Sequence, residues 1–562
     1  MPSRHRRPPA ATAAAVLAAR VLAASVLTSS LAGPRLLRAQ PVLGAGDDAT
    51  LPAPGQARAR GIATLSAWGS TFAPGARAGL GSNLTTDSLG PTQFPLLRAA
   101  RDTLRAITGN SALPLSLGRV QVRAYDQVQS VPVIVEVGVT RRFAVGVNVP
   151  FVRTHTTISS NVNPGGTNGN FGLNPANAAL SGTSSAAAAL ARNGAVQNNL
   201  TAAATALRTA GAAALADSIT RFAAGLASVY GNGTKAGANV VPLLGSDAQT
   251  AVVRELGHYA ARAQAAGVAL DSTTVPYPAQ ARIGFPGFTN ALSDSSFGLA
   301  STNSLLGGFR RSVGDVELTG MFQWLNTFGD SADSRAAVRA RVAPTGLRVR
   351  STIVGGFRFG TGHGEIPGVL LDVPPATGAN AILARSITDV VFTRSLSVSG
   401  SVRFAAPLGD TQRLRVPVSL DSGYVPLYRE RDVGRTLGRD VQVELDPRYA
   451  RGESFAVWGQ ALLRAHQADR YTGQYTATAA ETGGTPVAFD ASTLGEGTAQ
   501  REARVGLGLA YSTVAAWARG RARLPVEISY LHAVTAAGSG ATTPRLSSDV
   551  LSLRVFAGLR GR

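Results

Sequence analysis

The sequence predicts an all-β fold, an antiparallel transmembrane β-barrel of about twelve strands that an Ala-rich helical insertion interrupts. Three observations predict it. Apolar and polar residues alternate along many segments, so each predicted strand has one apolar and one polar face. The polar faces mix Gly, Ser and Thr with mid-strand charges, and strand lengths lie near the roughly 9–11 residues that cross a bilayer on a tilt. The links between strands alternate between short and long, as in membrane barrels.

Composition narrows the possible classes of protein. The chain has 562 residues, with 54 Lys+Arg, 33 Asp+Glu and only 15% charged residues, below the roughly 25% of a soluble domain. It has no Cys, which excludes disulfides, thiolate metal sites and cysteine nucleophiles. The net charge of +21 comes almost entirely from Arg spread singly along strands and turns. No basic run with interleaved aromatic residues follows residue 39, so we expect no nucleic-acid partner.

The N-terminus predicts export. Residues 1–39 have a basic start followed by a long run of Ala, Val and Leu, which is typical of a signal peptide cleaved after residue 32 or 39. Arg20 interrupts this run and argues against a permanent membrane helix. Residues 40–117 are predicted to form a periplasmic, plug-like segment or an extra hairpin, which would raise the count to fourteen strands. The barrel is predicted to span 118–562.

Alternation is clearest from Val131 to Phe151, where Val or Phe stands at nearly every second position. The short link 140–142 divides this stretch and is expected to be periplasmic, whereas the long links are expected outside the cell. Aromatic residues lie near both ends of the apolar faces and indicate two membrane interfaces: Phe143, Trp324 and Tyr511 at one end, and Phe151, Phe359 and Phe404 at the other. The predicted strands begin near residues 119, 131, 143, 313, 346, 385, 396, 438, 453, 500, 522 and 547.

Residues 154–312 are predicted to be an extracellular helical insertion within the barrel. One helical stripe comprises Leu215, Ile219, Phe222, Leu226 and Val229. A second helix is predicted after Ser246 and Gln249, which have the spacing of a capping box. The two helices would pack as a hairpin over the mouth of the barrel or inside its lumen. The alternative is a loosely ordered surface insertion, and the sequence leaves both open.

Charged residues on the polar faces are the candidate functional residues. They would form either a selectivity lining with excess positive charge or ion pairs that fill a narrow barrel, and the strand number favours the second interpretation. By parity they are Glu136, Glu317, Arg348, Arg350, Arg358, Arg403, Glu444, Arg464, Arg504, Glu527 and Arg554.

Catalytic, cofactor and metal sites are not predicted. The block around Ser331 resembles the first block of Gly-Asp-Ser esterases, but no Asp in the chain has a His three residues later. Glu255 and His258 match half of a carboxylate–imidazole metal motif without a second copy. We therefore expect a protein that is not an enzyme and that has no cofactor.

The stretch VIVEVGVTRRFAVGVNVPFV (133–152), together with 314–325, 353–362 and 386–410, resembles the strands of outer-membrane barrels of the phenol-degradation meta-pathway (MetA-pathway) family. The resemblance covers about 119–154 and 313–562. It implies a transporter-like channel in the outer membrane of a Gram-negative-type bacterium, for a small aromatic or hydrophobic molecule. The alternative is a non-conducting barrel that displays 154–312 for adhesion. Expected partners are outer-membrane lipid, lipopolysaccharide and the barrel assembly machinery.

Overall fold

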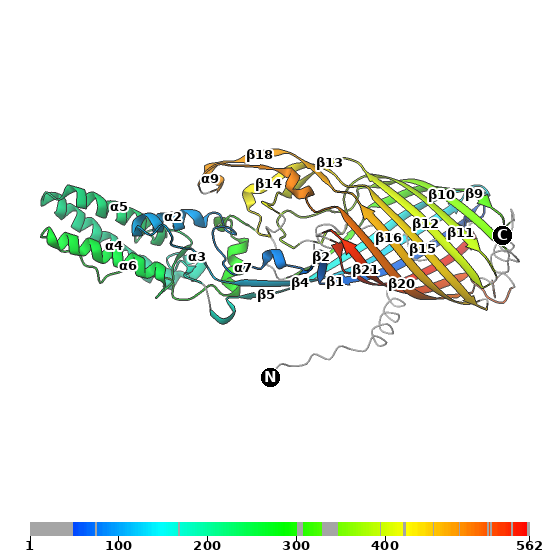
Figure 1. Cartoon of the computed structure of the whole chain (residues 1–562), viewed down its shortest axis with the longest axis horizontal. Coiled ribbons are helices and arrows are strands. Elements are labelled where there is room, and N and C mark those ends of the chain that lie inside the picture. Colours follow the sequence, from blue (N-terminus) through cyan, green and yellow to red (C-terminus); the bar gives the residue numbers. More distant parts are fainter. Residues whose placement is uncertain are drawn as a thin grey trace, which may run out of the picture.

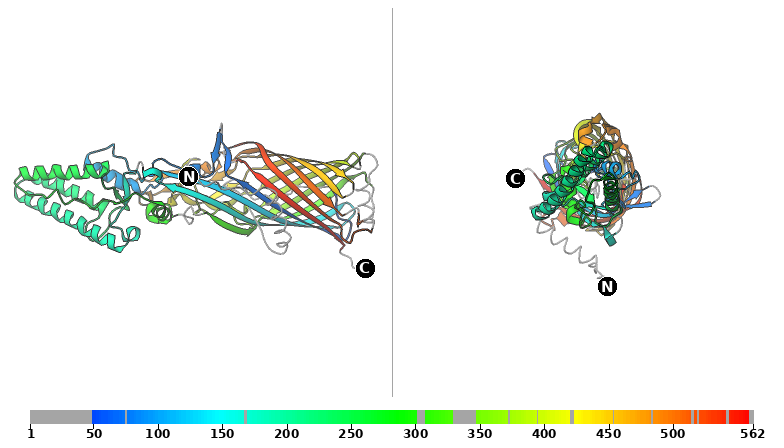
Figure 2. Two further views of the ribbon diagram at one scale, coloured as in Figure 1. Left: turned by 90° about the horizontal axis from the view of Figure 1, so that it is seen from below. Right: turned by 90° about the vertical axis from the view of Figure 1, so that its left-hand side faces the viewer.

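Twelve antiparallel strands close into a barrel in the computed structural model (Figures 1 and 2). The structure describes residues 49–558 except 74–75, 167–168, 301–306, 329–346, 372, 394, 420–422, 453, 483, 514–515, 518–519 and 541–542. In order around the barrel the strands are β1 (Gln56–Trp68), β4 (Val120–Gly138), β5 (Phe143–Val162), β9 (Val316–Asn326), β10 (Arg348–Phe359), β11 (Ala381–Val391), β12 (Leu396–Pro407), β15 (Asp440–Arg451), β16 (Phe455–His466), β20 (Gln500–Ser512), β21 (Val526–Ser539) and β23 (Ser547–Gly558). The last strand pairs with the first, from Gln56 opposite Gly558 to Ala67 opposite Ser547. The predicted fold class is confirmed.

The predicted strand positions differ from the structure in two places. One strand was missed and another was counted as two, so the predicted number of strands is still correct. Strand β1 was not predicted, and the predicted barrel start at residue 118 is therefore too late. The two strands predicted near 119 and 131 are one continuous strand, β4, in which Ser130 pairs with Thr64 and with Val152. Strand β1 escapes detection because its outward positions are mostly Ala and Gly, which give a weak alternation.

The two ends of the barrel differ in the length of their connections. We call the end with the short links, including 139–142 and 392–395, the turn end, and the opposite end the loop end. The predicted division into short and long links follows this arrangement except at 327–347, a long link at the turn end, and at 540–546, a short link at the loop end. Residues 69–119 lie at the loop end, together with the insertion. Of the segment 40–117, which was predicted to be a periplasmic, plug-like segment or an extra hairpin, residues 56–68 form the single barrel strand β1 and the described residues after it lie at the loop end.

Strands β4 and β5 continue past the barrel as a two-stranded ribbon, which β8 (Gly308–Val313) joins through β5. The ribbon leads to a helical region that lies beyond the loop end, outside the barrel (Figures 1 and 2). The helices therefore do not fill the lumen, which was one of the predicted arrangements. The helices are α2 (Leu97–Thr108), α3 (Ala178–Ser181), α4 (Thr183–Thr209), α5 (Ala213–Tyr230), α6 (Asp247–Ala265) and α7 (Phe285–Ser293), with short turns η1 (Ser82–Leu84), η2 (Pro164–Gly166) and η3 (Ser295–Phe297).

The helical region has its own apolar core. The predicted stripe on α5 is buried there apart from Leu215, which is partly buried. Helix α2, which comes from before the barrel strands β4 and β5, contributes Leu104 to the same core. Ser246 caps α6 as predicted, because its side chain accepts a hydrogen bond from Gln249 N (3.2 Å). The insertion is thus a packed unit rather than a loosely ordered surface segment.

Smaller elements lie at the loop end, and those between β13 and η5 surround an apolar cluster of their own. Tyr424, in the loop after β13, inserts into the helical core and donates a hydrogen bond from its hydroxyl to Leu84 O (2.6 Å). Burial raises the pKa of Tyr424 well above its usual range. The loop-end elements are β2 (Ser70–Ala73), β3 (Ala76–Gly79), β6 (Phe171–Leu173), β7 (Val240–Pro242), β13 (Asp410–Arg415), η4 (Leu427–Arg429), β14 (Glu430–Thr436), β17 (Arg470–Thr472), β18 (Gln474–Ala477), α9 (Ala479–Thr482), β19 (Val487–Asp490), η5 (Ala491–Gly495) and β22 (Thr543–Pro544).

Candidate functional site in the barrel lumen

The inward faces of the strands carry the charged residues predicted from parity. Nine of them form buried or partly buried ion pairs across neighbouring or nearby strands. Arg504 is the tenth and is partly exposed. Arg348 differs, because it lies at the turn end of β10 and donates a hydrogen bond to Thr327 O (2.6 Å). Their role in selectivity stays a prediction, whereas their position is now described.

Glu136 anchors the pairs between β1 and β4. Its carboxylate forms ion pairs with Arg58 and with Arg60, the second at 3.1 Å from Arg60 Nη2. All three side chains are buried. Both arginines were missed by sequence reasoning, because the weak alternation of β1 hid which of its residues face inward. The alternation of Arg58, Arg60, Ile62 and Thr64 with small residues was the only available signal.

Two further carboxylates form ion pairs on other strands of the barrel. Arg358 on β10 lies 2.9 Å from Glu317 on β9, whose other oxygen accepts a hydrogen bond from Asn148 Nδ2 (3.2 Å). Arg403 lies 3.4 Å from Glu444 across β12 and β15. Since such groups are costly to bury singly, each carboxylate is held in place by a cation on a neighbouring strand.

The third set of pairs lies on the strands nearest the C-terminus. Arg464 contacts Asp440 (2.7 Å) and Glu502 (3.6 Å), and Glu502 also pairs with Arg504 (2.8 Å). Glu527 likewise forms ion pairs with Arg448 (3.4 Å) and with Arg554 (3.9 Å). These contacts fit the interpretation in which ion pairs fill a narrow barrel.

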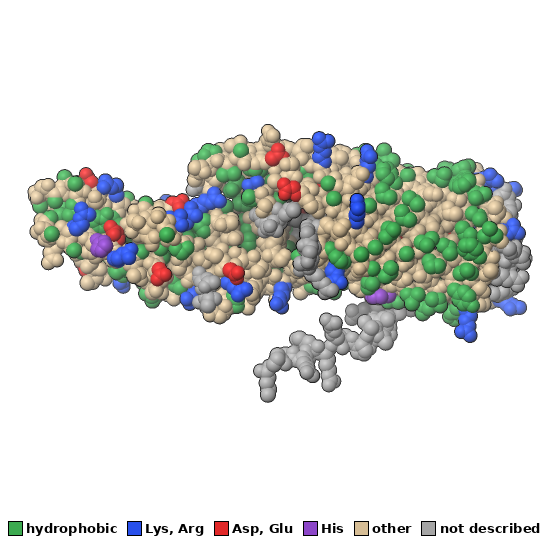
Figure 3. Space-filling model, in the orientation of Figure 1, with side chains coloured by type: hydrophobic (Ala, Val, Ile, Leu, Met, Phe, Trp, Pro, Cys, Tyr) green, Lys and Arg blue, Asp and Glu red, His purple; other side chains and the backbone are tan. Residues whose placement is uncertain are grey.

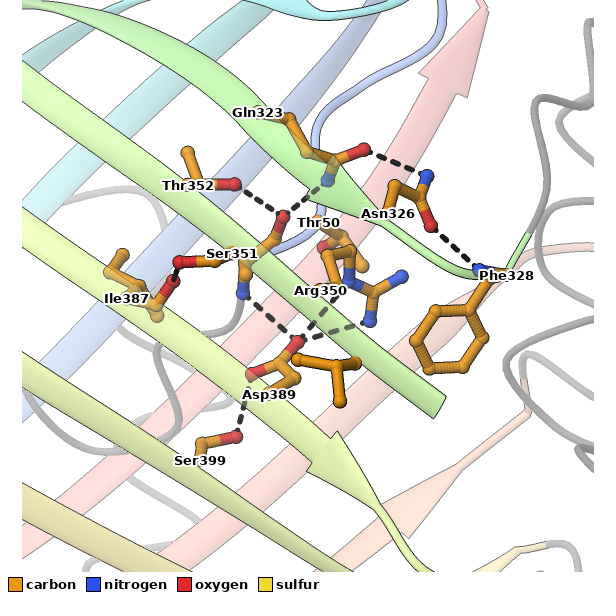
Figure 4. Close-up of polar contacts among 12 residues, drawn as sticks. Thr50, Gln323, Asn326, Phe328, Arg350, Ser351, Thr352, Ile387, Asp389 and Ser399 are labelled. Carbon is orange, nitrogen blue, oxygen red and sulfur yellow. Dashed lines mark hydrogen bonds and ion pairs between the residues drawn. The ribbon is translucent and has the colours of Figure 1, made fainter. Parts of the chain in front are cut away.

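The segment before β1 lies inside the lumen near the turn end (Figure 4). Ala49 is fully buried. Its N–H donates to Asp389 Oδ2 (3.0 Å), and its carbonyl accepts from Gln323 Nε2 and from Thr352 Oγ1 (both 2.7 Å). Asp389 also pairs with Arg350 (3.0 Å). We call residues 49–55 the lumen segment. Side chains from three strands therefore bind the backbone of its first residue, Ala49.

Apolar side chains complete this contact. Ala49 and Leu51 pack against an inward-facing patch of Ala144, Met321, Val354 and Ile387. A second apolar cluster, which includes Ile62, Trp458 and Leu531, lies on the inward faces of other strands. The lumen segment covers an apolar surface inside the barrel.

Three cavities follow one another from the lumen segment toward the loop end. The first, about 20 Å³ open to the centres of water molecules, lies beside Thr50 and Leu51 and shares Val354 with the second, which is about 50 Å³. The second shares Arg358 with the third, about 20 Å³, which reaches His466. Each holds at most a few water molecules. These three cavities, lined by described residues, are small spaces that adjoin one another along the lumen.

The outer surface of the barrel indicates which solvent surrounds it. Large apolar side chains stand exposed all around the strands and form a belt over the barrel (Figure 3). They include Val133, Val145, Leu318, Phe322, Ile353, Ile382, Val402, Val443, Leu445, Val457, Leu463, Val505, Leu507, Leu509, Ile528 and Leu553. A soluble protein rarely exposes a continuous apolar surface of this kind, whereas lipid requires one. This is a transmembrane β-barrel.

The predicted aromatic residues border the belt of this transmembrane barrel. Phe143 opens β5 at the turn end, and Phe359 closes β10 at the loop end, both exposed to the outside. Among the residues that the structure describes, no helix is long and apolar enough to cross a membrane.

Comparisons with known proteins add little beyond shape. No family model and no curated protein matches the chain. Among solved structures it is similar to an outer membrane channel from Pseudomonas putida F1, at 7% identity over 91% of this chain and 98% of that chain, with a TM-score of 0.37. It is also similar to the monoaromatic hydrocarbon channel CymD (8%, 90% and 89%, 0.24) and to the toluene transporter TbuX of Ralstonia pickettii (8%, 91% and 92%, 0.24). At these identities and TM-scores the similarities carry no argument about cargo or mechanism.

Two motifs resemble parts of metal or catalytic sites in the sequence, and the structure describes one of them fully. His258 lies 3.4 Å from Glu255 on the exposed surface of α6. No group of three or more potential metal ligands occurs within the described ranges. Most of the esterase-like block around Ser331 falls in 329–346, outside the described residues.

Proposed function

We propose that this transmembrane barrel is an outer-membrane transporter for a small hydrophobic molecule, and that the lumen segment gates it. One observation carries the proposal. An apolar patch lies on the inward face of the barrel among ion-paired residues, and the chain's own segment covers it through Ala49 and Leu51. Moving the segment aside would expose an apolar surface at one end of the row of cavities. A cargo with an aromatic ring or an acyl chain could occupy that surface, because burying apolar area is favourable.

The proposal includes an orientation. Short turns face the periplasm and long loops face outward in outer-membrane barrels, so the turn end and the lumen segment would lie on the periplasmic side. The helical region would then project from the cell. Hydrophobic cargo entering from outside would meet the gate last, after the ion-paired part of the lumen.

A disulfide lock tests the gate, because the chain has no Cys of its own. Ala49→Cys with Thr352→Cys would join two residues that now share a hydrogen bond. We expect the oxidised double variant to lose uptake of radiolabelled toluene and fatty acid into proteoliposomes, and reductant to restore it. Each single variant serves as a control, since neither can close the lock.

Equal uptake in the oxidised and reduced double variant, with the disulfide verified, would contradict the gate. If the reduced protein also takes up neither cargo, the transporter proposal fails, and the barrel would be better explained as a support for the helical region.

A further inference from the structure

The outward faces of β5 and β8 change from apolar to basic at one level. On β5, Phe151 ends the exposed apolar row, and Arg153 and His155 follow on the same face. On β8, Val313 is followed in the same direction by Arg311 and Phe309. Because side chains alternate along a strand, all of these point outward from the barrel. The basic residues therefore lie just past the apolar belt, on the loop side.

Arg153 and Arg311 are direct cross-strand neighbours. Side chains at such positions start about 4.5–5.5 Å apart, and like charges placed there repel. The outward positions of β4, β5 and β8 carry no Asp or Glu. Arg153 donates a long hydrogen bond to Gln129 Oε1 (3.4 Å), while its buried Nε has no partner in the described structure. The pair is a concentrated positive charge without a carboxylate on its own face.

Phe309 holds the two basic side chains of β5 in place. The guanidinium of Arg153 lies over its ring, 4.6 Å from the centroid, and the imidazole of His155 stacks on it at 4.0 Å with nearly parallel planes. A cation fixed in this way loses less conformational entropy when it binds an anion. The exposed ring of Phe309 also offers an apolar contact beside the charges.

We propose that Gln129, Arg153, His155, Phe309 and Arg311, the outer Arg cluster, bind a phosphate group of a phosphorylated glycolipid in the outer leaflet. Arginine binds phosphate with two parallel hydrogen bonds, and the cluster lies at the level where headgroups begin above the apolar belt. The inference rests on the proposed outer-membrane location. It does not depend on the lumen or on transport.

The test uses full-length protein in a neutral detergent, titrated with bisphosphorylated lipid A and with lipid A whose phosphates have been removed. We expect the wild type to prefer the phosphorylated form. Arg153→Gln with Arg311→Gln should weaken binding of that form about 30-fold, because each arginine near an anionic lipid surface contributes about fivefold. The dephosphorylated form should bind both proteins alike. Millimolar inorganic phosphate should not displace the lipid, since the cluster also contacts its apolar part.

Arg123→Gln is the matched control. Arg123 is exposed on the outward face of β4, six residues or roughly 20 Å beyond Gln129, and its replacement should leave lipid A binding unchanged. The single variant Arg311→Gln, at an exposed position, guards against misfolding of the double variant, and heat-modifiable migration on gels verifies the barrel. Equal affinity of wild type and Arg311→Gln, or no preference of the wild type for phosphorylated lipid A, would overturn the proposal. Uptake in proteoliposomes of neutral lipid should be normal in both variants, which separates this test from that of the transporter.

Discussion

Glu136 illustrates what a single carboxylate does inside this barrel. It lies between Arg58 and Arg60 of the first strand, and all three side chains are buried where the first strand meets β4. Burying an ion pair gives little net stability compared with apolar packing, but removing one partner is costly because a charge is left behind in a medium of low dielectric. The same reasoning applies to Glu317, Glu444 and Glu527.

Glu136→Gln should therefore destabilise the barrel by about 3–5 kcal/mol, because it removes the negative charge between two buried guanidinium groups. Urea-induced unfolding in lipid vesicles, followed by tryptophan fluorescence, measures this. Asp217→Asn is the control, since Asp217 pairs with Arg208 on the exposed surface of the helical region, where ion pairs contribute little. Equal unfolding midpoints for Glu136→Gln and wild type would contradict the account.

The path of the lumen segment depends on a close approach between its own backbone and the backbone at the end of β4. Gly55 turns the chain with a positive φ of 71° and donates from its N–H to Gly138 O (2.9 Å) at the end of β4. A Cβ at Gly138 would lie 2.3 Å from the carbonyl oxygens of Pro52 and Ala53. Only Gly allows the segment to leave the lumen along this path.

Gly138→Val should displace the lumen segment while the barrel remains closed. We expect larger single-channel conductance in planar bilayers than for the wild type, with unchanged heat-modifiable migration. Gly61→Ala provides the comparison, since a Cβ at Gly61 of β1 meets nothing within 4 Å. Conductance of Gly138→Val at the wild-type level would show that the segment does not limit the pore.

At the scale of the whole molecule, two strands extend well beyond the length that a membrane barrel requires. A strand of about 9–11 residues crosses a bilayer, but β4 has 19 residues and β5 has 20. The excess forms the ribbon that carries the helical region beyond the loop end (Figure 1). Tyr424 ties a second loop to the same core, so the projecting part is joined to the barrel at more than one point.

A tag inserted at Gly211 should be labelled on intact cells, whereas one in the turn 140–142 should be labelled only after the membrane is opened. Gly211 lies in the turn between α4 and α5, has a positive φ of 80° and has open space around it. Recovery of both tagged proteins in the outer-membrane fraction is the control. Labelling of the turn alone on intact cells would invert the proposed orientation.

Sequence reasoning recovered the strands whose outward residues are large and missed the one whose outward residues are small. Val133, Val145 and Leu507 made their strands visible, whereas the Ala and Gly residues of β1 did not. Parity placed Glu136 and Arg358 on inward faces, because alternation along a strand is a local property. It could not provide the partner of Glu136, since Arg58 and Arg60 lie on the undetected strand.

The sequence by itself determined the class of fold, the division into short and long links and the helical nature of the insertion, because periods of two and of 3.6 residues are written in consecutive positions. Only the tertiary structure decided that residues 49–55 occupy the lumen, that α2 shares a core with the insertion, and that Arg153 stands opposite Arg311. Each of these depends on contacts between segments far apart in the chain or on the register of paired strands. A shift of register by two residues would keep every local pattern and change every partner.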